Sequence, residues 1–231
     1  MNSYGERFRI SMFGESHGEL IGVVMDGVPA GIPLCEEDFL ADLDRRRSGS
    51  KGTTPRKESD TPHIVSGVVD GHTTGAPLTV VFRNENTVSK DYSAFRDCPR
   101  PGNADFTASV KHNGFNDIRG GGHFSGRLTL PIVAAGVVAK KILQDATMLD
   151  ETPFAGVNAR IVELGGIPEK TSAPTEGAQN ALAESSQEAT GIEARLSEMP
   201  TQWQDAIDAA IKEGDSLGAV FRLHSCGNLA G

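Results

Sequence analysis

The sequence predicts an α+β fold built on antiparallel sheets. Short runs of alternating or β-branched apolar residues recur along the chain, and several of them are separated by glycine-containing turns. Longer segments with helical patterns and start or stop signals stand between these runs. Strands with hairpin spacing, then a helix, then further strands are typical of α+β proteins rather than of a doubly wound parallel sheet.

The chain opens with two predicted strands. The first spans Arg7 to Phe13, where Phe8, Ile10 and Met12 alternate with polar residues. The second is the β-branched run "ELIGVVMDG" that follows Gly18, and the glycines and prolines after it predict a turn. We therefore expect a bend at residues 14–18 that joins two strands.

A helix is expected next, over "LCEEDFLADLDRRRSG". Acidic residues at its start and arginines at its end complement the helix dipole, and Gly49 is a stop signal. Phe39, Leu40 and Leu43 are its predicted core residues.

The remaining elements follow the same rules. "HIVSGVV" and "PLTVVF" predict two antiparallel strands. Residues 83–122 predict a long, loop-rich stretch, and the length of such a stretch in a compact domain indicates a functional role. Pro131 is compatible with the next helix if it lies in the first turn. The last elements expected are a helix over 125–145, a strand over 156–166, a helix over 200–214 with a Thr201/Gln204 capping box and a Gly214 stop, and a strand over 217–224.

Composition narrows the class of protein. The net charge of −9 argues against a nucleic-acid-binding protein. Cys35, Cys98 and Cys226 are far apart and form no C-x-x-C motif, so neither a disulfide framework nor a zinc site is expected and a reducing cytoplasm fits. No secretory signal is evident at the start. The longest apolar run, residues 128–139, is shorter than the roughly 18 residues of a membrane span.

"FGESHG" carries the first candidate chemistry. Gly14, Ser16 and Gly18 spell the G-x-S-x-G of a serine hydrolase, in which Ser16 would be the nucleophile. That elbow requires a parallel sheet before it and a helix directly after it, whereas this chain predicts a strand on each side. The other reading makes His17 a reachable acid or base on the bend.

Two further stretches indicate an anionic ligand. "RRRSGSKGTTPRK", residues 45–57, is either a solvated loop or an anion site, because arginine presents a fork of donors to phosphate and carboxylate. "RGGGHFSGR", residues 119–127, is either a packing loop or a cradle whose backbone N–H groups bind phosphate or a cofactor. From spacing alone, we expect an enzyme acting on an anionic, phosphorylated small molecule.

Read together and in order, the motifs resemble those of the chorismate synthase family. They are "FGESHGELIGVVMDGVPAGIPL", "DRRRSG", "TTPRKESD", "SGVVDGHTTGAPL", "SKDYS", "RPGNADF", "RGGGHFSGR" and, late in the chain, "EGDSLG". The resemblance implies helices sandwiched between antiparallel sheets and a homotetramer. It also implies conversion of 5-enolpyruvylshikimate 3-phosphate to chorismate, a lyase reaction of the shikimate pathway of aromatic amino acid biosynthesis that uses reduced FMN, with NADPH as a possible reductant.

The same resemblance implies roles for individual residues. His17 is the acid that assists the leaving phosphate, with Ser16 as a polar neighbour. Arg46 matches the arginine assigned to reduced pyridine nucleotide or to a substrate anion. His123, Phe124 and Ser125 match the triplet that contacts FMN, and Arg100 and Arg127 are expected to bind substrate carboxylate or phosphate.

Two features depart from the family pattern. Asn103 occupies the position of a histidine credited with proton exchange at the flavin, and an amide does not titrate. The chain also stops at Gly231, short of the usual family length, so we expect one domain over residues 1–231 that is truncated at its C-terminal end and carries a polar insert at about 168–190. The alternative function is an impaired homologue that only binds anions.

Overall fold

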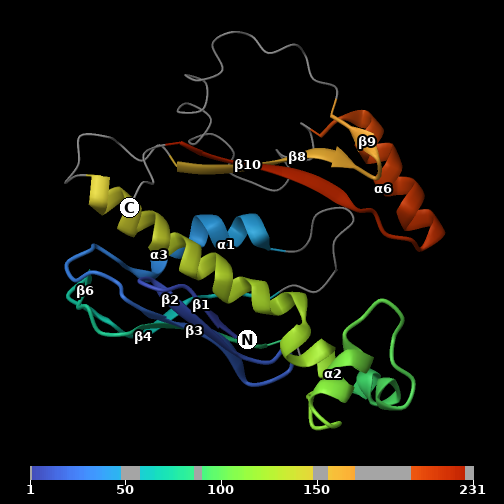
Figure 1. Ribbon diagram of the computed structural model, residues 1–231, viewed down its shortest axis with the longest axis horizontal. Coiled ribbons are helices and arrows are strands. Elements are labelled where there is room, and N and C mark those ends of the chain that lie inside the picture. The colour runs from blue at the N-terminus through green and yellow to red at the C-terminus, as the bar shows by residue number, and fades with distance from the viewer. Residues whose placement is uncertain (1, 48–57, 86–89, 148–155, 170–198, 227–231) are drawn as a thin grey trace. The chain divides into compact units, whose positions relative to one another are not determined.

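The computed structural model describes residues 2–47, 58–85, 90–147, 156–169 and 199–226 (Figure 1). These residues fall into two compact units. The first unit holds the described residues up to Asp145, and the second holds those from Ala146 onward. All strand pairings between these residues are antiparallel, so the predicted α+β class is confirmed.

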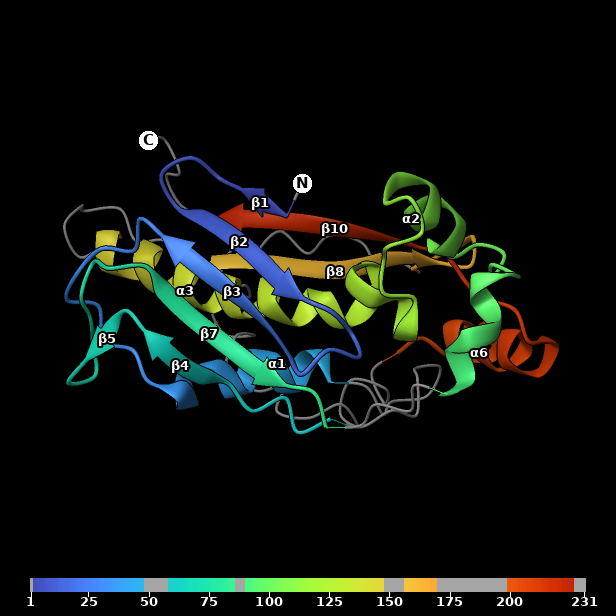
Figure 2. The same ribbon diagram turned by 90° about the horizontal axis from the view of Figure 1, so that it is seen from below.

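The first unit is built on a five-stranded sheet in the order β1-β2-β3-β7-β4. Figure 2 shows this sheet face on, with α3 and α1 behind it. Its strands are β1 (Ser3–Tyr4), β2 (Arg9–Gly14), β3 (Leu20–Asp26), β7 (Leu78–Arg83) and β4 (His63–Ser66). A separate two-stranded sheet pairs β5 (Val68–Val69) with β6 (His72–Thr73).

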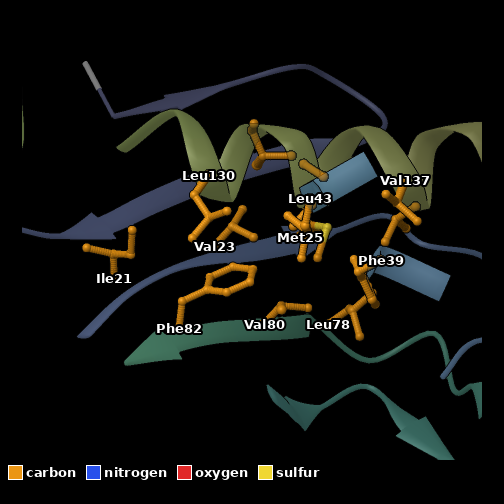
Figure 3. Packing of buried hydrophobic residues seen from close by; sticks show 14 of the residues in the cluster. Ile21, Val23, Met25, Phe39, Leu43, Leu78, Val80, Phe82, Leu130 and Val137 are labelled. Atoms are coloured by element: carbon orange, nitrogen blue, oxygen red, sulfur yellow. The ribbon is translucent and has the colours of Figure 1, made fainter. Parts of the chain in front are cut away.

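Helices cover one face of this sheet and form the core with it (Figure 3). The register between β3 and β7 pairs Ile21 with Phe82, Val23 with Val80 and Met25 with Leu78, and all six side chains are fully buried. The helical side of the core comes from Phe39 of the 3₁₀ helix η1 (Glu36–Phe39), Leu43 of α1 (Leu40–Arg46), and Leu130 and Val137 of α3 (Thr129–Thr147). Period-2 alternation on the strands therefore places one apolar face against two helices.

Several predictions about the first unit need correction. Leu40 was expected in the core but is 42% exposed, because the helix begins as a 3₁₀ turn and only Phe39 and Leu43 face the sheet. The stretch predicted as loop contains η2 (Lys90–Arg96), α2 (Asp105–Lys111) and η3 (Arg119–Phe124), and η4 (Gly126–Leu128) precedes α3. Pro131 does lie in the first turn of α3. The Gly49 stop signal and most of the basic stretch 45–57 lie outside the described residues.

Among its described residues, the second unit holds a three-stranded sheet and one helix. The strand order is β10-β8-β9, with bounds Ala219–Cys226, Gly156–Leu164 and Ile167–Pro168. Helix α6 (Thr201–Glu213) ends at Gly214, which adopts a left-handed conformation as predicted. The capping-box prediction is wrong, because Thr201 is already helical and the N-cap is Pro200, which has no side-chain donor or acceptor. Most of the expected polar insert lies outside the described residues.

The structure answers two further questions raised by the sequence. Among the described residues, no helix combines the length and apolar character needed to cross a bilayer. No group of histidine, cysteine or acidic residues suited to a metal ion occurs among them either. The expectation of a single domain stays a prediction.

Candidate active site

A short bend between β2 and β3 carries Ser16 and His17. The N–H of Gly18 donates to the carbonyl of Glu15 at 3.0 Å, which closes the turn. The side-chain amide of Asn84, just after β7, donates to the carbonyls of Glu15 (3.0 Å) and Gly18 (2.9 Å). Because this one amide bonds both ends of the turn, it fixes the backbone on which the two side chains stand. Ser16 and His17 are both buried, with 1% and 7% exposure.

The strand that follows the bend excludes the hydrolase elbow. β3 begins at Leu20 and runs antiparallel to β2, so no helix follows Ser16 directly. A nucleophile elbow needs the serine between a strand and the helix that comes after it. The Ser16 nucleophile alternative therefore loses its structural basis.

The triglycine segment of η3 packs directly against the bend. Gly120, Gly121 and Gly122 have φ values of +60°, +81° and +55°, which favour glycine. A Cβ at Gly120 would lie 2.4 Å from Cδ2 and 2.6 Å from Nε2 of His17. The N–H of Ser16 donates to the carbonyl of Gly122 at 3.1 Å. The glycines thus allow a close approach to the His17 ring that side chains would prevent.

Hydrogen bonds of His123 connect the same segment to the strand before the bend. Its Nδ1 lies 3.0 Å from the carbonyl oxygen of Gly14, and its Nε2 lies 3.0 Å from Oδ1 of Asn2. Phe124 is 45% exposed and contacts His112, with ring centroids 6.0 Å apart. The hydroxyl of Ser125 accepts the N–H of Arg127 at 3.3 Å and so caps η4. Of the three predicted FMN residues, His123 therefore adjoins the strand before the bend, and both His123 and Ser125 are hydrogen-bonded to other protein atoms.

Four arginines surround this region, and each pairs with an aspartate. Arg127 and Arg46 both bind the buried carboxylate of Asp60, Arg46 at 3.4 Å. The pairs further along the chain are Arg100 with Asp105 (2.8 Å) and Arg119 with Asp117 (2.7 Å). A carboxylate beside each guanidinium fixes its orientation and offsets its charge.

Arg127 also connects this network to the bend. Its Nε donates to Oδ1 of Asn84 at 2.9 Å, and its Nη2 donates to the carbonyl of Arg83 at 3.4 Å. Its side chain is only 6% exposed. Arg46, which is more open, donates to Oγ1 of Thr129 (3.1 Å) and to the carbonyl of Gly126 (3.2 Å). Burial lowers the pKa of Arg46, opposed by the charge of Asp60.

Two aspartates of this region, Asp117 and Asp105, have lowered pKa values. Hydrogen bonds from Arg119 lower the pKa of Asp117, and the nearby charge of His17 acts in the same direction. Hydrogen bonds from Arg100 likewise lower the pKa of Asp105. Asn103, exposed on the surface, accepts from Nη2 of Arg100 at 3.4 Å, so it lies beside this pair.

The structure also shows site residues that sequence reasoning did not single out: Asp60, Asn84, Tyr92, Asp105 and Asp117. Asp60, Tyr92 and Asp105 lay within the quoted motifs "TTPRKESD", "SKDYS" and "RPGNADF", which was the available signal. Asn84 carried no such signal, because its role depends on where β7 ends beside the bend. His63, His72 and His224 are exposed and lie outside this site.

The fold and the site define an α+β protein in which a buried histidine on a strand bend is enclosed by a glycine-rich loop, amid arginines paired with aspartates. Comparison with known proteins names the family. A chorismate synthase family model matches residues 8–231, so this chain belongs to the chorismate synthase family.

Individual relatives agree with this assignment. The chain is 59% identical over 169 residues to the chorismate synthase of Chitinophaga pinensis, covering 73% of this chain and 48% of the relative. It is 42% identical over 220 residues to that of Dehalococcoides mccartyi, covering 95% and 57%. A solved structure described as a crystal structure of chorismate synthase shares the fold, with a TM-score of 0.61, 24% identity, and coverage of 94% of this chain and 58% of that one. The chain spans about half the length of the curated relatives it matches.

Proposed function

We propose that this chain acts as a chorismate synthase, a lyase that eliminates phosphate from 5-enolpyruvylshikimate 3-phosphate in a trans 1,4 sense to give chorismate. The observation that carries the proposal is the placement of His17. In a chain of this family, the ring lies in a fixed position between the triglycine segment and Tyr92, amid arginines. The reaction belongs to the shikimate pathway of aromatic amino acid biosynthesis.

The chemistry requires stabilisation of a departing anion. When the C–O bond to phosphate breaks, its electrons leave with the phosphate oxygen. The C–H bond at the other end of the allylic system also breaks, its electrons enter the new double bond, and its proton passes to a base. A protonated His17 would donate its proton to that oxygen as negative charge develops on it. Because the charge is larger in the transition state than in the bound ester, a donor and cations fixed beforehand lower the barrier.

The proposed anion contacts are Arg46 and Arg100. A guanidinium has five N–H donors, so Arg100, which bonds Asp105 through Nε and Nη2, keeps donors for a second anion. Arg127 stays a predicted substrate residue, and its observed bonds give it a second task, which is to hold Asn84 and hence the bend.

The residues present fit reduced FMN. The exposed ring of Phe124 offers an apolar surface for an isoalloxazine, and Ser125 keeps its hydroxyl proton for donation because its oxygen is the acceptor toward Arg127. His123 would contact the flavin through its ring, and Arg46 would bind a phosphate. When bound, reduced FMN supplies electron density to the reacting centre and recovers it, so the reaction has no net redox change. NADPH as reductant and a homotetramer belong to the same proposal.

The test is turnover by the purified chain. The chain is mixed anaerobically with 5-enolpyruvylshikimate 3-phosphate and chemically reduced FMN, and both chorismate and inorganic phosphate are measured. We expect the two products in equal amounts. His17→Ala should lower the rate by about 10²–10⁴-fold, the usual contribution of general acid catalysis. His63→Ala, at an exposed histidine, is the matched control and should leave the rate unchanged.

Two results would contradict the proposal. Binding of the phosphate ester without chorismate formation would favour the anion-binding alternative. In that alternative, the chain lacks a proton relay because Asn103 stands where the family has a histidine. An unchanged rate in His17→Ala would remove the imidazole from the mechanism. Light scattering on the same sample checks the tetramer.

A further inference from the structure

Tyr92 is in contact with His17, although 75 positions separate them in the chain. Their ring centroids lie 5.0 Å apart with an interplanar angle of 83°, a T-shaped arrangement that aromatic pairs prefer. Tyr92 belongs to η2 (Lys90–Arg96), whereas His17 stands on the bend between β2 and β3. The contact therefore depends on the docking of η2 over the bend.

Arg100 also contacts the ring of Tyr92. Cζ of Arg100 lies 5.5 Å from the ring centroid of Tyr92 and 4.6 Å from that of Phe95, which are cation–π distances. The rings of Tyr92 and Phe95 are themselves 6.0 Å apart. One guanidinium thus covers two aromatic residues of η2.

Asp105 fixes the position of that guanidinium. Its carboxylate accepts from Nε and Nη2 of Arg100, both at 2.8 Å, and from the backbone N–H of Arg100 at 3.1 Å. Asp105 is itself 4% exposed. A bidentate pair of this kind orients the guanidinium plane, so the order of contacts runs from Asp105 to Arg100, then to Tyr92 and His17.

Two separate segments thereby contact the imidazole. The triglycine segment contacts it at Gly120, where a Cβ would lie 2.6 Å from Nε2, and Tyr92 contacts it with a ring. We propose that Tyr92 is a positioning residue for His17, and that the Asp105–Arg100 pair holds Tyr92 in place. This rests on the proposed function, in which His17 must meet one oxygen atom of the leaving group. Preorganised contacts of this kind keep a donor in its productive orientation.

The first test measures access to the imidazole without any substrate. The full chain is treated with diethylpyrocarbonate near neutral pH, and carbethoxylation of each histidine is followed by peptide mass spectrometry. Tyr92→Leu should raise the rate at His17 roughly threefold to tenfold, the factor that corresponds to one aromatic pair. Tyr92→Phe keeps the ring and should match the wild type. The exposed His63, His72 and His224 are internal controls and should react at unchanged rates.

Asp105→Asn is a second and independent variant, because it leaves Tyr92 itself intact. It should also raise the rate of carbethoxylation at His17, because the guanidinium of Arg100 loses its charged partner. An unchanged rate at His17 in both Tyr92→Leu and Asp105→Asn would overturn the proposal. So would a rise at all four histidines together, which reports general unfolding.

Turnover gives a second readout that a merely structural role would not reproduce. With reduced FMN, Tyr92→Leu should lower kcat while KM stays near the wild-type value, and Tyr92→Phe should restore kcat. A rise in KM alone would contradict a positioning role. If the wild-type chain forms no chorismate, the proposed function fails, and the carbethoxylation rates still decide whether Tyr92 holds His17.

Discussion

Replacing Gly120 by alanine would drive a methyl group into the imidazole of His17. The new Cβ would lie 2.4 Å from Cδ2 of His17 and 2.8 Å from Oγ of Ser16, whereas carbon atoms in contact are separated by about 3.5–4 Å. The ring therefore has to move by roughly 1 Å or rotate away. Gly120→Ala tests directly whether the triglycine segment positions the histidine.

The cost has two parts. An L-residue in the left-handed conformation of Gly120, with φ +60° and ψ 18°, costs about 1–2 kcal/mol. Forcing a side chain off its rotamer adds about 0.5–1.5 kcal/mol. The free energy of unfolding should therefore fall by about 1.5–3.5 kcal/mol in total.

Gly121→Ala is the matched control, because it carries the cost of the left-handed backbone conformation but no clash with His17. Gly121 has φ +81°, and a Cβ there would meet Ser125 at 3.8 Å and Nη2 of Arg100 at 4.0 Å, which are ordinary contacts. Its expected loss is about 1–2 kcal/mol. Both alanines reduce the entropy of the unfolded chain alike, so the difference between the variants isolates the clash.

The assay is urea unfolding followed by far-UV circular dichroism, since the single tryptophan, Trp203, lies in the second unit and does not report on this one. In turnover experiments, a displacement of about 1 Å at His17 should cost Gly120→Ala roughly 100-fold, whereas Gly121→Ala should retain most of its activity. Equal destabilisation and equal loss of rate in the two variants would refute the reasoning.

Three further predictions concern stability. Phe39→Ala should cost about 3–5 kcal/mol because the side chain is fully buried, whereas Leu40→Ala beside it, at a position 42% exposed, should cost less than about 1 kcal/mol in urea unfolding. Asp60→Asn should lower the free energy of unfolding by about 3–5 kcal/mol, because the buried Arg127 loses its charged partner. Asp70→Asn, also at positive φ but exposed, is the control and should have almost no effect. Similar values for the two variants would contradict the buried-pair argument. Arg100 lowers the pKa of Asp105 in the fold, so this carboxylate stabilises the protein fully above its unfolded pKa and loses the effect as the pH falls through the folded value. Unfolding from about pH 5 downward should show a shallower loss of stability in Asp105→Asn than in the wild type.

Several predictions from local pattern were accurate, although the Thr201/Gln204 capping box was not. Alternation located β2, and the β-branched run after Gly18 located β3. The Gly214 stop signal depends on one residue's backbone freedom and was confirmed. Leu40 was misplaced because its burial depends on which side of the helix meets the sheet, and a short helix with a 3₁₀ start has no single period from which to read this.

The site was predicted only in part for a related reason. His17 and the triglycine segment were identified as candidates, but their mutual contact depends on φ values that only glycine reaches readily. Arg46, Arg100 and Arg127 were predicted as anion ligands, whereas their aspartate partners were not. For Arg127 the reason is that 67 positions separate it from Asp60, whereas Asp105 lies only five positions from Arg100 and was missed although it is local.

By itself, the sequence determined the α+β class, most of the elements, the motifs of the family and the identity of the candidate acid, because these follow from properties of single residues and short patterns. Only the tertiary structure decided which distant groups meet: Gly120 and Tyr92 against His17, Asn84 across the bend, and Asp60 with Arg46 and Arg127. The physical reason is that backbone preferences act over a few residues. The contacts of a buried imidazole are made when the sheet and its covering segments pack together, and that packing brings distant positions within hydrogen-bonding range.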